Sequence, residues 1–344
     1  MIPEPVLRIL RHPDSNKVLS VVSPDGFPHS IVLGALMADD EDRIYVGEAF
    51  MYRTAKYLEE SPNAEFLVWK GKDGYSYITQ IGTGNYNEKT AGLYTDLCLM
   101  TSNNDIAQDA CEVFRTLSMG ELVENSKALM VAPHCLQNKV VELMDNEISI
   151  ARAGGEGYVA AKLNSLTDKV LMDKIIECSQ AGVKVELVIR GISCLVAGVE
   201  GVTDNVQIRS IVGRYLEHAR IYIFGTGVRK KVYISSADYM TRNTTRRVEV
   251  AAPILSEEVK KRVLDIFDTQ MQDNVKARIM QPDGKYVRAE RGDIAIDAQS
   301  RFYAEAYANA PKPAPVNDSK AVEPEKEKKG FLGWLKRLFR RKKK

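Results

Sequence analysis

The sequence is poor in the residues that build metal and redox sites. It has only five cysteines and four histidines among 344 residues. The cysteines are scattered, without the close pairing that zinc sites and disulfide frameworks show. An odd, unclustered set of this kind is typical of a chain in a reducing cytosol. We therefore expect no metal site and mainly a core-packing role for the cysteines: Cys98, Cys111, Cys135, Cys178 and Cys194.

Long apolar runs are also missing. No apolar stretch approaches the ~20 residues that a membrane-spanning helix needs, and the N-terminus does not have the pattern of a signal peptide. The contents of 44% hydrophobic and 27% charged residues are those of a globular protein. A chain of this length can hold two domains with cores of their own.

Acidic residues are absent from the C-terminal tail. The net charge is +2, but residues 330–344 carry seven basic residues, and removing them leaves −5 on the rest. The body is therefore not a general nucleic-acid binder, and we expect no specific nucleic-acid partner. In the tail, five apolar residues share one helical face and the basic residues lie opposite, which predicts a cytoplasmic protein that lies peripherally on an anionic membrane. A solvated tail and capture of a polyanion are alternatives. The five are Phe331, Leu332, Leu335, Leu338 and Phe339, with Trp334 at the edge.

The periodicity of the remaining sequence predicts an α/β fold. Apolar residues at helical spacing indicate helices over 105–117, 136–148, 168–180 and 256–272. An almost wholly apolar strand, Val185–Ile189, follows the third of them, as in a β-α-β unit. Arg190 then lies at the carboxyl end of this strand, where open α/β sheets bind ligands.

Two stretches combine small residues with cations and a histidine. In the second half, His218 begins a strand at 221–224, and a turn at 225–227 leads to a strand at 232–234 that returns Ser235–Asp238 to its side. In the first half, Gly82–Asn85 forms a similar loop after a predicted hairpin of 65–69 and 75–81 around the turn 70–74. Small residues let backbone N–H groups approach an anion, and Arg, Lys and His supply charge and proton transfer. The pattern predicts phosphoryl chemistry in a cleft between two similar halves.

These motifs resemble a known family. From about Tyr77 to Arg288 the chain is similar to the C-terminal catalytic region of polyphosphate kinases. The motifs that carry this resemblance are TGNYNEKTAGLYTD, VIRG, SIVGRYLEHARIYIF and YISSADYMTRN. The resemblance implies a phospholipase-D-like mixed sheet with flanking helices, and transfer of the ATP γ-phosphate to inorganic polyphosphate through a phosphohistidine, with magnesium. By position, Tyr94, Arg190 and His218 match residues that contact the nucleotide. His218 also matches the second catalytic histidine, and Arg220 stands for the lysine of the family's His-x-Lys.

The first half departs from this family. Where the family has its nucleophilic histidine, this sequence has Ser61 or Asn63. The lysine that follows in the family is replaced by Glu65, and a further family histidine is replaced by Gln80. The second half-site is therefore complete and the first lacks its nucleophile. We expect the chain alone to bind ATP or polyphosphate but to autophosphorylate poorly, unless a second copy or another partner chain completes the site.

The first 74 residues resemble a different family, the FMN-binding split barrels of the pyridoxamine-phosphate-oxidase type. The order is strand, Asp-Gly turn, strand, acidic turn, strand, and a short helix entered at Arg53 and Thr54. The resemblance implies that these two residues hold the flavin phosphate, as helix N-termini do. Only the first part of the barrel is present, so we expect a partial β-barrel-like segment without tight FMN binding.

The expected organisation is therefore a split-barrel-like segment (1–74), a polyphosphate-kinase-like region (75–295), a short helix and disordered linker (296–329) and a basic tail (330–344). Three functions remain open at this point. They are a polyphosphate-kinase-like phosphotransferase, a non-catalytic module that binds polyphosphate or nucleotide, and a flavin-binding protein with a structural C-terminal part.

Overall fold

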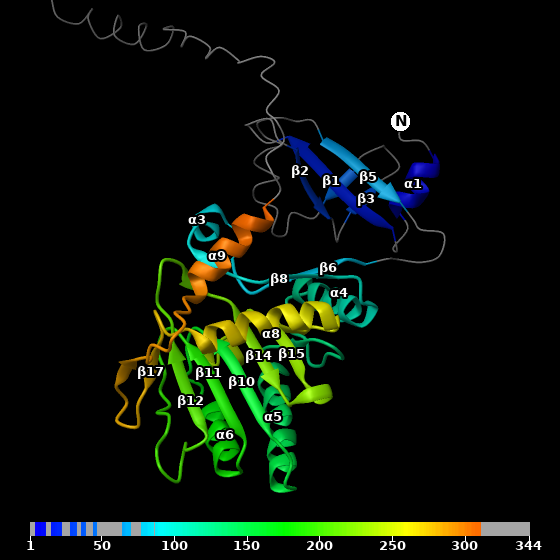
Figure 1. Cartoon of the computed structure of the whole chain (residues 1–344). Coiled ribbons are helices and arrows are strands. Elements are labelled where there is room, and N and C mark those ends of the chain that lie inside the picture. Colours follow the sequence, from blue (N-terminus) through cyan, green and yellow to red (C-terminus); the bar gives the residue numbers. More distant parts are fainter. Residues whose placement is uncertain are drawn as a thin grey trace, which may run out of the picture. The chain divides into compact units, whose positions relative to one another are not determined.

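A nine-stranded mixed sheet dominates the described part of the chain (Figure 1). The computed structural model describes residues 4–11, 15–22, 28–32, 36–38, 44–46, 64–69, 77–85 and 87–310. The chain divides into two compact units, residues 1–299 and 300–344. The strand order of the large sheet is β18-β17-β12-β11-β10-β14-β15-β16-β9.

The centre of this sheet is a β-α-β unit, as the sequence predicts. β10 (Tyr158–Leu163) pairs in parallel with β11 (Lys184–Ile189), and α6 (Lys169–Gln180) connects them. β12 (Val206–Ser210) continues the parallel part. On the other side of β10, the hairpin of β14 (Arg220–Phe224) and β15 (Lys231–Ser235) is antiparallel, with Arg220 opposite Ser235. The expected second-half hairpin is therefore confirmed.

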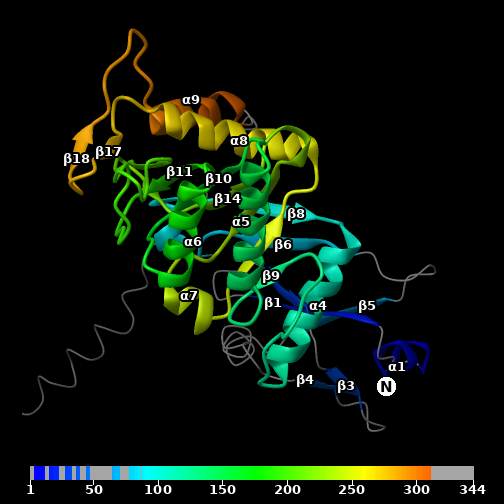
Figure 2. The same ribbon diagram turned by 90° about the horizontal axis from the view of Figure 1, so that it is seen from below.

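Helices cover both faces of the sheet, and the alternation along β10 shows why. Val159, Ala161 and Leu163 face a core formed with α5 (Leu136–Arg152) and α6, whereas Ala160 faces a core formed with α8 (Glu257–Gln272). Figure 2 shows α8 on one side of the strands and α5 and α6 on the other. A strand that is buried on both faces is mainly apolar on both, which explains its composition apart from Lys162, whose buried ammonium pairs with Glu217. The expected α/β fold, a mixed sheet with flanking helices, is confirmed.

Side-chain caps begin three of the predicted helices where expected. Asp168 accepts the backbone N–H of Leu171 at 3.1 Å at the start of α6. Asn103 does the same for α4 (Asn104–Ser118), and Ser256 for α8. Such caps satisfy N–H groups that have no partner inside the helix. The buried face of α8 includes Val263 and Phe267, whereas Val259 is exposed.

The first-half hairpin predicted over 65–81 does not form. β5 (Ala64–Trp69) pairs antiparallel with β1 (Asn16–Val22), which also pairs with β2 (Pro28–Val32). β6 (Thr79–Gly82) instead pairs with β8 (Cys98–Thr101). The two strands of the predicted hairpin thus belong to different sheets, because β5 pairs with an earlier strand and β6 with a later one.

The remaining described elements are shorter or lie outside the central layers. They are α1 (Glu4–Arg11), β3 (Leu36–Ala38), β4 (Ile44–Val46), α3 (Glu88–Ala91), β7 (Tyr94–Thr95), β9 (Met130–Val131), β13 (Leu216–Glu217), α7 (Thr241–Thr245), β16 (Val250–Pro253), β17 (Arg278–Met280), β18 (Tyr286–Arg288) and α9 (Ala298–Asn309).

Candidate functional site

Two very short strands bring the two sequence motifs together. β7 and β13 pair in parallel, with Leu216 opposite Tyr94 and Glu217 opposite Thr95. The backbone N–H groups of His218 and Ala219 both donate to the carbonyl of Thr95, at 3.2 and 2.9 Å. This pairing joins segments more than a hundred residues apart and places Tyr94 and Asp96 beside His218.

His218 is buried and contacted on several sides. Its Nδ1 lies 2.9 Å from Oδ1 of Asp96, and the Tyr94 ring stacks on it with centroids 4.2 Å apart. A carboxylate only accepts hydrogen bonds, so Nδ1 carries the hydrogen and Nε2 of the neutral ring keeps its lone pair. The hydrogen position is assigned here from this partner, as is usual for histidine.

Arg220 is held in place by the protein itself. Its Nε and Nη2 donate to the two oxygens of Asp238, at 3.3 and 3.0 Å, and Nη1 donates to the carbonyls of Thr83 and His218. Nη1 also lies 3.2 Å from both ring nitrogens of His218, which places it over the ring face, since an in-plane position at that distance would collide with ring carbons. All three guanidinium nitrogens are therefore engaged. Asp238 therefore pairs with Arg220.

The first-half small-residue loop supports Asp96. Thr83 is buried, its hydroxyl donates to Oδ1 of Asp96 at 2.8 Å, and the same hydroxyl accepts the N–H of Leu97. A Cβ added to Gly84 would lie 1.9 Å from Oδ2 of Asp96. The loop therefore has small residues because it lies against a carboxylate. Its described contacts are those of a support for Asp96, not of an open cradle for an anion.

Arg190 has guanidinium N–H donors that no described residue uses. It follows β11, is half-buried, and its Nε donates to Oδ1 of Asn164 at 2.7 Å, while no hydrogen bond involves its Nη atoms in the described residues. Burial lowers the pKa of Arg190, and the nearby Asp238 partly offsets this. Asn164 also donates its backbone N–H to Asp238 at 2.6 Å. Asn164 therefore links Arg190 to the cluster around His218.

The loop Ser235–Asp238 is fixed from both ends. The Tyr222 hydroxyl, buried inside β14, donates to the carbonyl of Ala237 at 2.6 Å, and burial raises the pKa of this phenol. Ser236 donates to Glu249 at 2.5 Å. The loop that the sequence predicts beside His218 is thus preorganised, which limits the entropy lost on binding a ligand.

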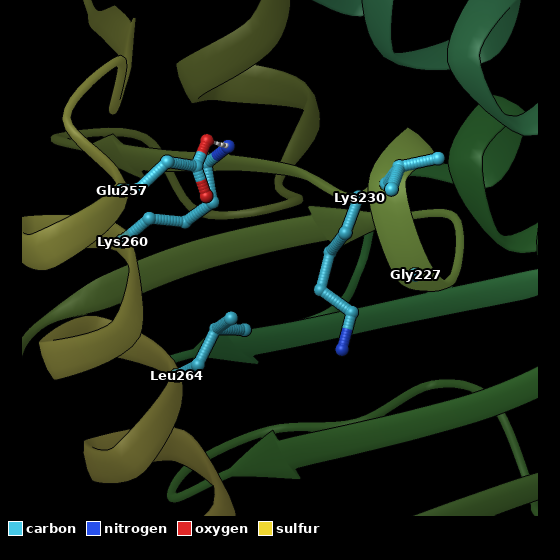
Figure 3. Close-up of a pocket in the computed structure, with 6 residues that line it drawn as sticks. Gly227, Lys230, Glu257, Lys260 and Leu264 are labelled. Atoms are coloured by element: carbon cyan, nitrogen blue, oxygen red, sulfur yellow. Dashed lines mark hydrogen bonds and ion pairs between the residues drawn. The ribbon is translucent and has the colours of Figure 1, made fainter.

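A separate pocket lies at the far end of the same hairpin (Figure 3). It encloses about 320 Å³, with Glu257 and Lys260 paired on one side and Lys230 across from them. β14 separates it from His218, and five strand residues span about 16 Å. The pocket is therefore not part of the His218 cluster. Its lining residues are Gly227, Val228, Lys230, Glu257, Lys260 and Leu264.

Other expectations concern metal, membrane and flavin. Across the described ranges, no group of three or more His, Cys, Asp or Glu side chains could hold a metal ion. No helix in that part of the chain is both long and apolar enough to cross a bilayer. Arg53 and Thr54 lie outside the described residues.

Sequence reasoning named Tyr94, Arg190, His218 and Arg220 and both small-residue loops of the site, but it missed Asn164 and Asp96. Tyr94 and His218 are in direct contact, and Arg190 is connected to them through Asn164. Asn164 follows β10 just as Arg190 follows β11, so the same rule for strand ends could have identified it. Asp96 gave no such signal, because its partner His218 is distant in the sequence.

The sequence matches two family models. Residues 62–122 match the family model of polyphosphate kinase C-terminal domain 1, and residues 129–299 match that of C-terminal domain 2. These residues belong to the polyphosphate kinase family. The match to this family is wider than the 77–288 expected from the motifs. It begins inside the segment that we had likened to a flavin barrel, and that second resemblance is not supported.

Similar proteins include polyphosphate kinases of Lactiplantibacillus plantarum, 43% identical over 70% of this chain and 34% of the relative, and Bacillus anthracis, 45% identical over 71% and 35%. The crystal structure of polyphosphate kinase from Porphyromonas gingivalis is also similar, with a TM-score of 0.66 and 33% identity over 71% of this chain and 38% of that one. The chain thus spans about a third of the length of these relatives.

Proposed function

We propose that this chain carries the second half of a polyphosphate kinase site, which binds ATP and inorganic polyphosphate through Tyr94, Arg190 and His218. The observation that carries the proposal is the contact of His218 with Asp96 and Tyr94, within a region of polyphosphate kinase sequence. A histidine oriented by a carboxylate is the arrangement that nucleophiles and general acids or bases need.

The chemistry of the site assigns different tasks to its two arginines. Arg220 donates its hydrogen bonds to Asp238 and Thr83, so it stabilises the structure of the site and does not bind the substrate. Arg190 has its Nη donors left for the oxygens of a phosphate, where two parallel N–H donors bind well. His218 would present Nε2 to the phosphorus or to a proton, with Nδ1 held by Asp96. Cations on the equatorial oxygens are the main stabilisation in phosphoryl transfer.

The helix after the small-residue loop supports a long anionic substrate. Arg242, Arg246 and Arg247 lie in or just after α7, directly beyond Ser235–Asp238, and all three are exposed. Within the described part of the chain, their guanidinium groups form no hydrogen bond or ion pair. Three cations without a described partner next to this loop suit a polyanion better than a single small phosphate.

Phosphoryl transfer by the chain alone is expected to be weak. The family's first-half nucleophile is replaced at Ser61 or Asn63, and the chain has only three histidines besides His218. A general acid or base contributes about 10²–10⁴-fold, but it does not replace the nucleophile of a two-step mechanism. This departure favours the second candidate function, a module that binds polyphosphate or nucleotide without catalysis.

Binding measurements test the proposal first. Arg190→Ala is expected to weaken binding of ATP with magnesium, and of polyphosphate, about 10–100-fold, since hydrogen bonds to charged groups contribute about 1.5–3 kcal/mol. Arg115→Ala is the matched control, because that exposed arginine pairs with Glu112 on its own helix. Unchanged binding in both Arg190→Ala and His218→Ala would show that the site is wrongly placed.

Labelling with γ-labelled ATP separates the two candidate functions. Little acid-labile label on the wild-type chain, together with binding, supports the non-catalytic module. Strong labelling that disappears in His218→Ala would identify His218 as the phosphate acceptor and support the phosphotransferase function. Labelling that rises more steeply than the protein concentration would indicate that a second copy completes the site.

A further inference from the structure

A buried carboxylate lies directly beside the candidate site but touches no part of it that would meet a substrate. Glu217 precedes His218 and is 2% exposed. Four side chains donate to it: the hydroxyl of Thr95 at 3.1 Å, the ammonium of Lys162 at 3.2 Å, and the amides of Gln270 and Gln299, each at 2.7 Å. These four donors replace the hydrogen bonds that water would give to the carboxylate.

These donors come from elements that are far apart in the sequence. Thr95 belongs to β7, Lys162 to β10 and Gln270 to α8. Gln299 also makes two hydrogen bonds with the backbone of Tyr215, just before β13. Lys162 in turn donates to the carbonyl of Ala219, just after His218. The chain is therefore held on both sides of His218 by groups that also hold Glu217.

We infer that Glu217 is a positioning residue, which fixes the register of β13 against β7 and so sets the His218–Asp96 contact. The inference deepens the proposed function and rests on it for its biological meaning. Two strands of two residues each have too few backbone hydrogen bonds to specify one register by themselves. The Thr95–Glu217 hydrogen bond joins the same pair of residues that the register places opposite each other.

The arrangement also explains why charge is buried here. Removing Lys162 and Glu217 from water is costly, and a buried ion pair is often no more stabilising than apolar residues. Burial lowers the pKa of Lys162, while its ion pair with Glu217 opposes this change. Such pairs are best justified where they specify one arrangement, and here that arrangement aligns Asp96 with His218.

The hydrogen position on His218 provides a readout that needs no substrate. With the full chain carrying ¹⁵N-labelled histidine, only four side chains contribute NMR signals, and His218→Asn identifies the one of interest. The wild-type neutral ring is expected in the Nδ1–H form because Asp96 accepts that hydrogen. Asp96→Asn defines the signals expected when this contact is lost.

Thr95→Val is the decisive variant, since it keeps the shape and removes the hydroxyl that reaches Glu217. We expect its His218 signals to move most of the way to those of Asp96→Asn, and Glu217→Gln to do the same if it folds. Thr245→Val is the control, because that exposed hydroxyl bonds only within its own helix. A merely stabilising role would lower the melting temperature and leave the His218 signals unchanged.

The outcomes separate the inference from the proposed function. Wild-type signals in a folded Thr95→Val variant, or a wild-type ring that is not in the Nδ1–H form, would overturn the inference. Displaced signals in Thr95→Val, in a protein whose wild type binds neither ATP nor polyphosphate, would support the positioning role and refute the proposed function.

Discussion

At the scale of single residues, the site depends on how closely the backbone approaches Asp96. This carboxylate lies against Gly84, accepts from Thr83 and faces His218. Its two neighbours on the loop therefore have different tasks. Thr83 supplies a hydrogen bond, and Gly84 supplies the space in which the carboxylate lies.

Gly84→Ala is expected to displace Asp96, because the new Cβ would lie 1.9 Å from its Oδ2. We expect a loss of about 1–3 kcal/mol in the free energy of unfolding, as for other overpacked sites, together with weaker ATP binding. Gly92→Ala is the matched control, since nothing lies within 4 Å of its added Cβ and its backbone is helical. Urea unfolding of both variants checks this, and equal stabilities would refute the close approach.

The cysteines give a second prediction at this scale. Burial raises the pKa of the Cys178 thiol to about 12. Only the thiolate reacts, so at pH 8 about one Cys178 in 10⁴ is reactive, and this fraction stays small up to pH 10. Exposed Cys194 should be alkylated by iodoacetamide in the folded protein, whereas Cys178 should react only after unfolding. Peptide mass spectrometry after timed alkylation distinguishes them, and equal rates would contradict the structure.

At the scale of elements, local patterns were predictable and long-range pairings were not. The β14–β15 hairpin and the β10–α6–β11 unit follow from turns, caps and apolar runs that are contiguous in the sequence. The hairpin expected over 65–81 was wrong because β1 and β8 provide the partners instead. Strand propensity does not specify a partner. The β7–β13 contact, on which the site depends, has only two residues per strand and gave no signal at all.

Asp168 connects three helices and should matter more than an ordinary cap. Besides capping α6, it accepts from Gln137 of α5 at 2.9 Å and from Thr244 of α7 at 2.6 Å. Asp168→Ala removes the cap of α6 and the acceptor that joins α5 and α7 to it, so we expect a loss of about 2–4 kcal/mol. Ser256→Ala removes an exposed cap of α8 and should cost about 1 kcal/mol or less. Thermal unfolding of both variants tests the difference, and equal losses would show that Asp168 acts only as a cap.

At the scale of the whole molecule, the chain combines polyphosphate kinase C-terminal domain sequence with a strongly asymmetric charge. It matches about a third of the length of its polyphosphate kinase relatives. The second-half cluster around His218 is closely packed, which is why we propose that it binds a ligand without the first-half histidine. The sequence identified this half because its histidine, arginines and small residues lie in contiguous motifs. It could not show whether another chain supplies the other half, because that depends on assembly.

The basic tail gives the last prediction, which comes from the sequence alone because residues 311–344 lie outside the described ranges. Each of its seven basic residues should add about 1 kcal/mol of attraction near an anionic surface, and its apolar residues add burial. The full chain should therefore sediment with phosphatidylserine-containing vesicles, and a chain ending at residue 329 should not. Phosphatidylcholine vesicles are the control, since they lack the negative charge. Equal binding by the two chains would assign membrane attachment to another part of the protein. Binding of free polyphosphate by the full chain and not by the chain ending at residue 329 would instead indicate that the tail captures the polyanion.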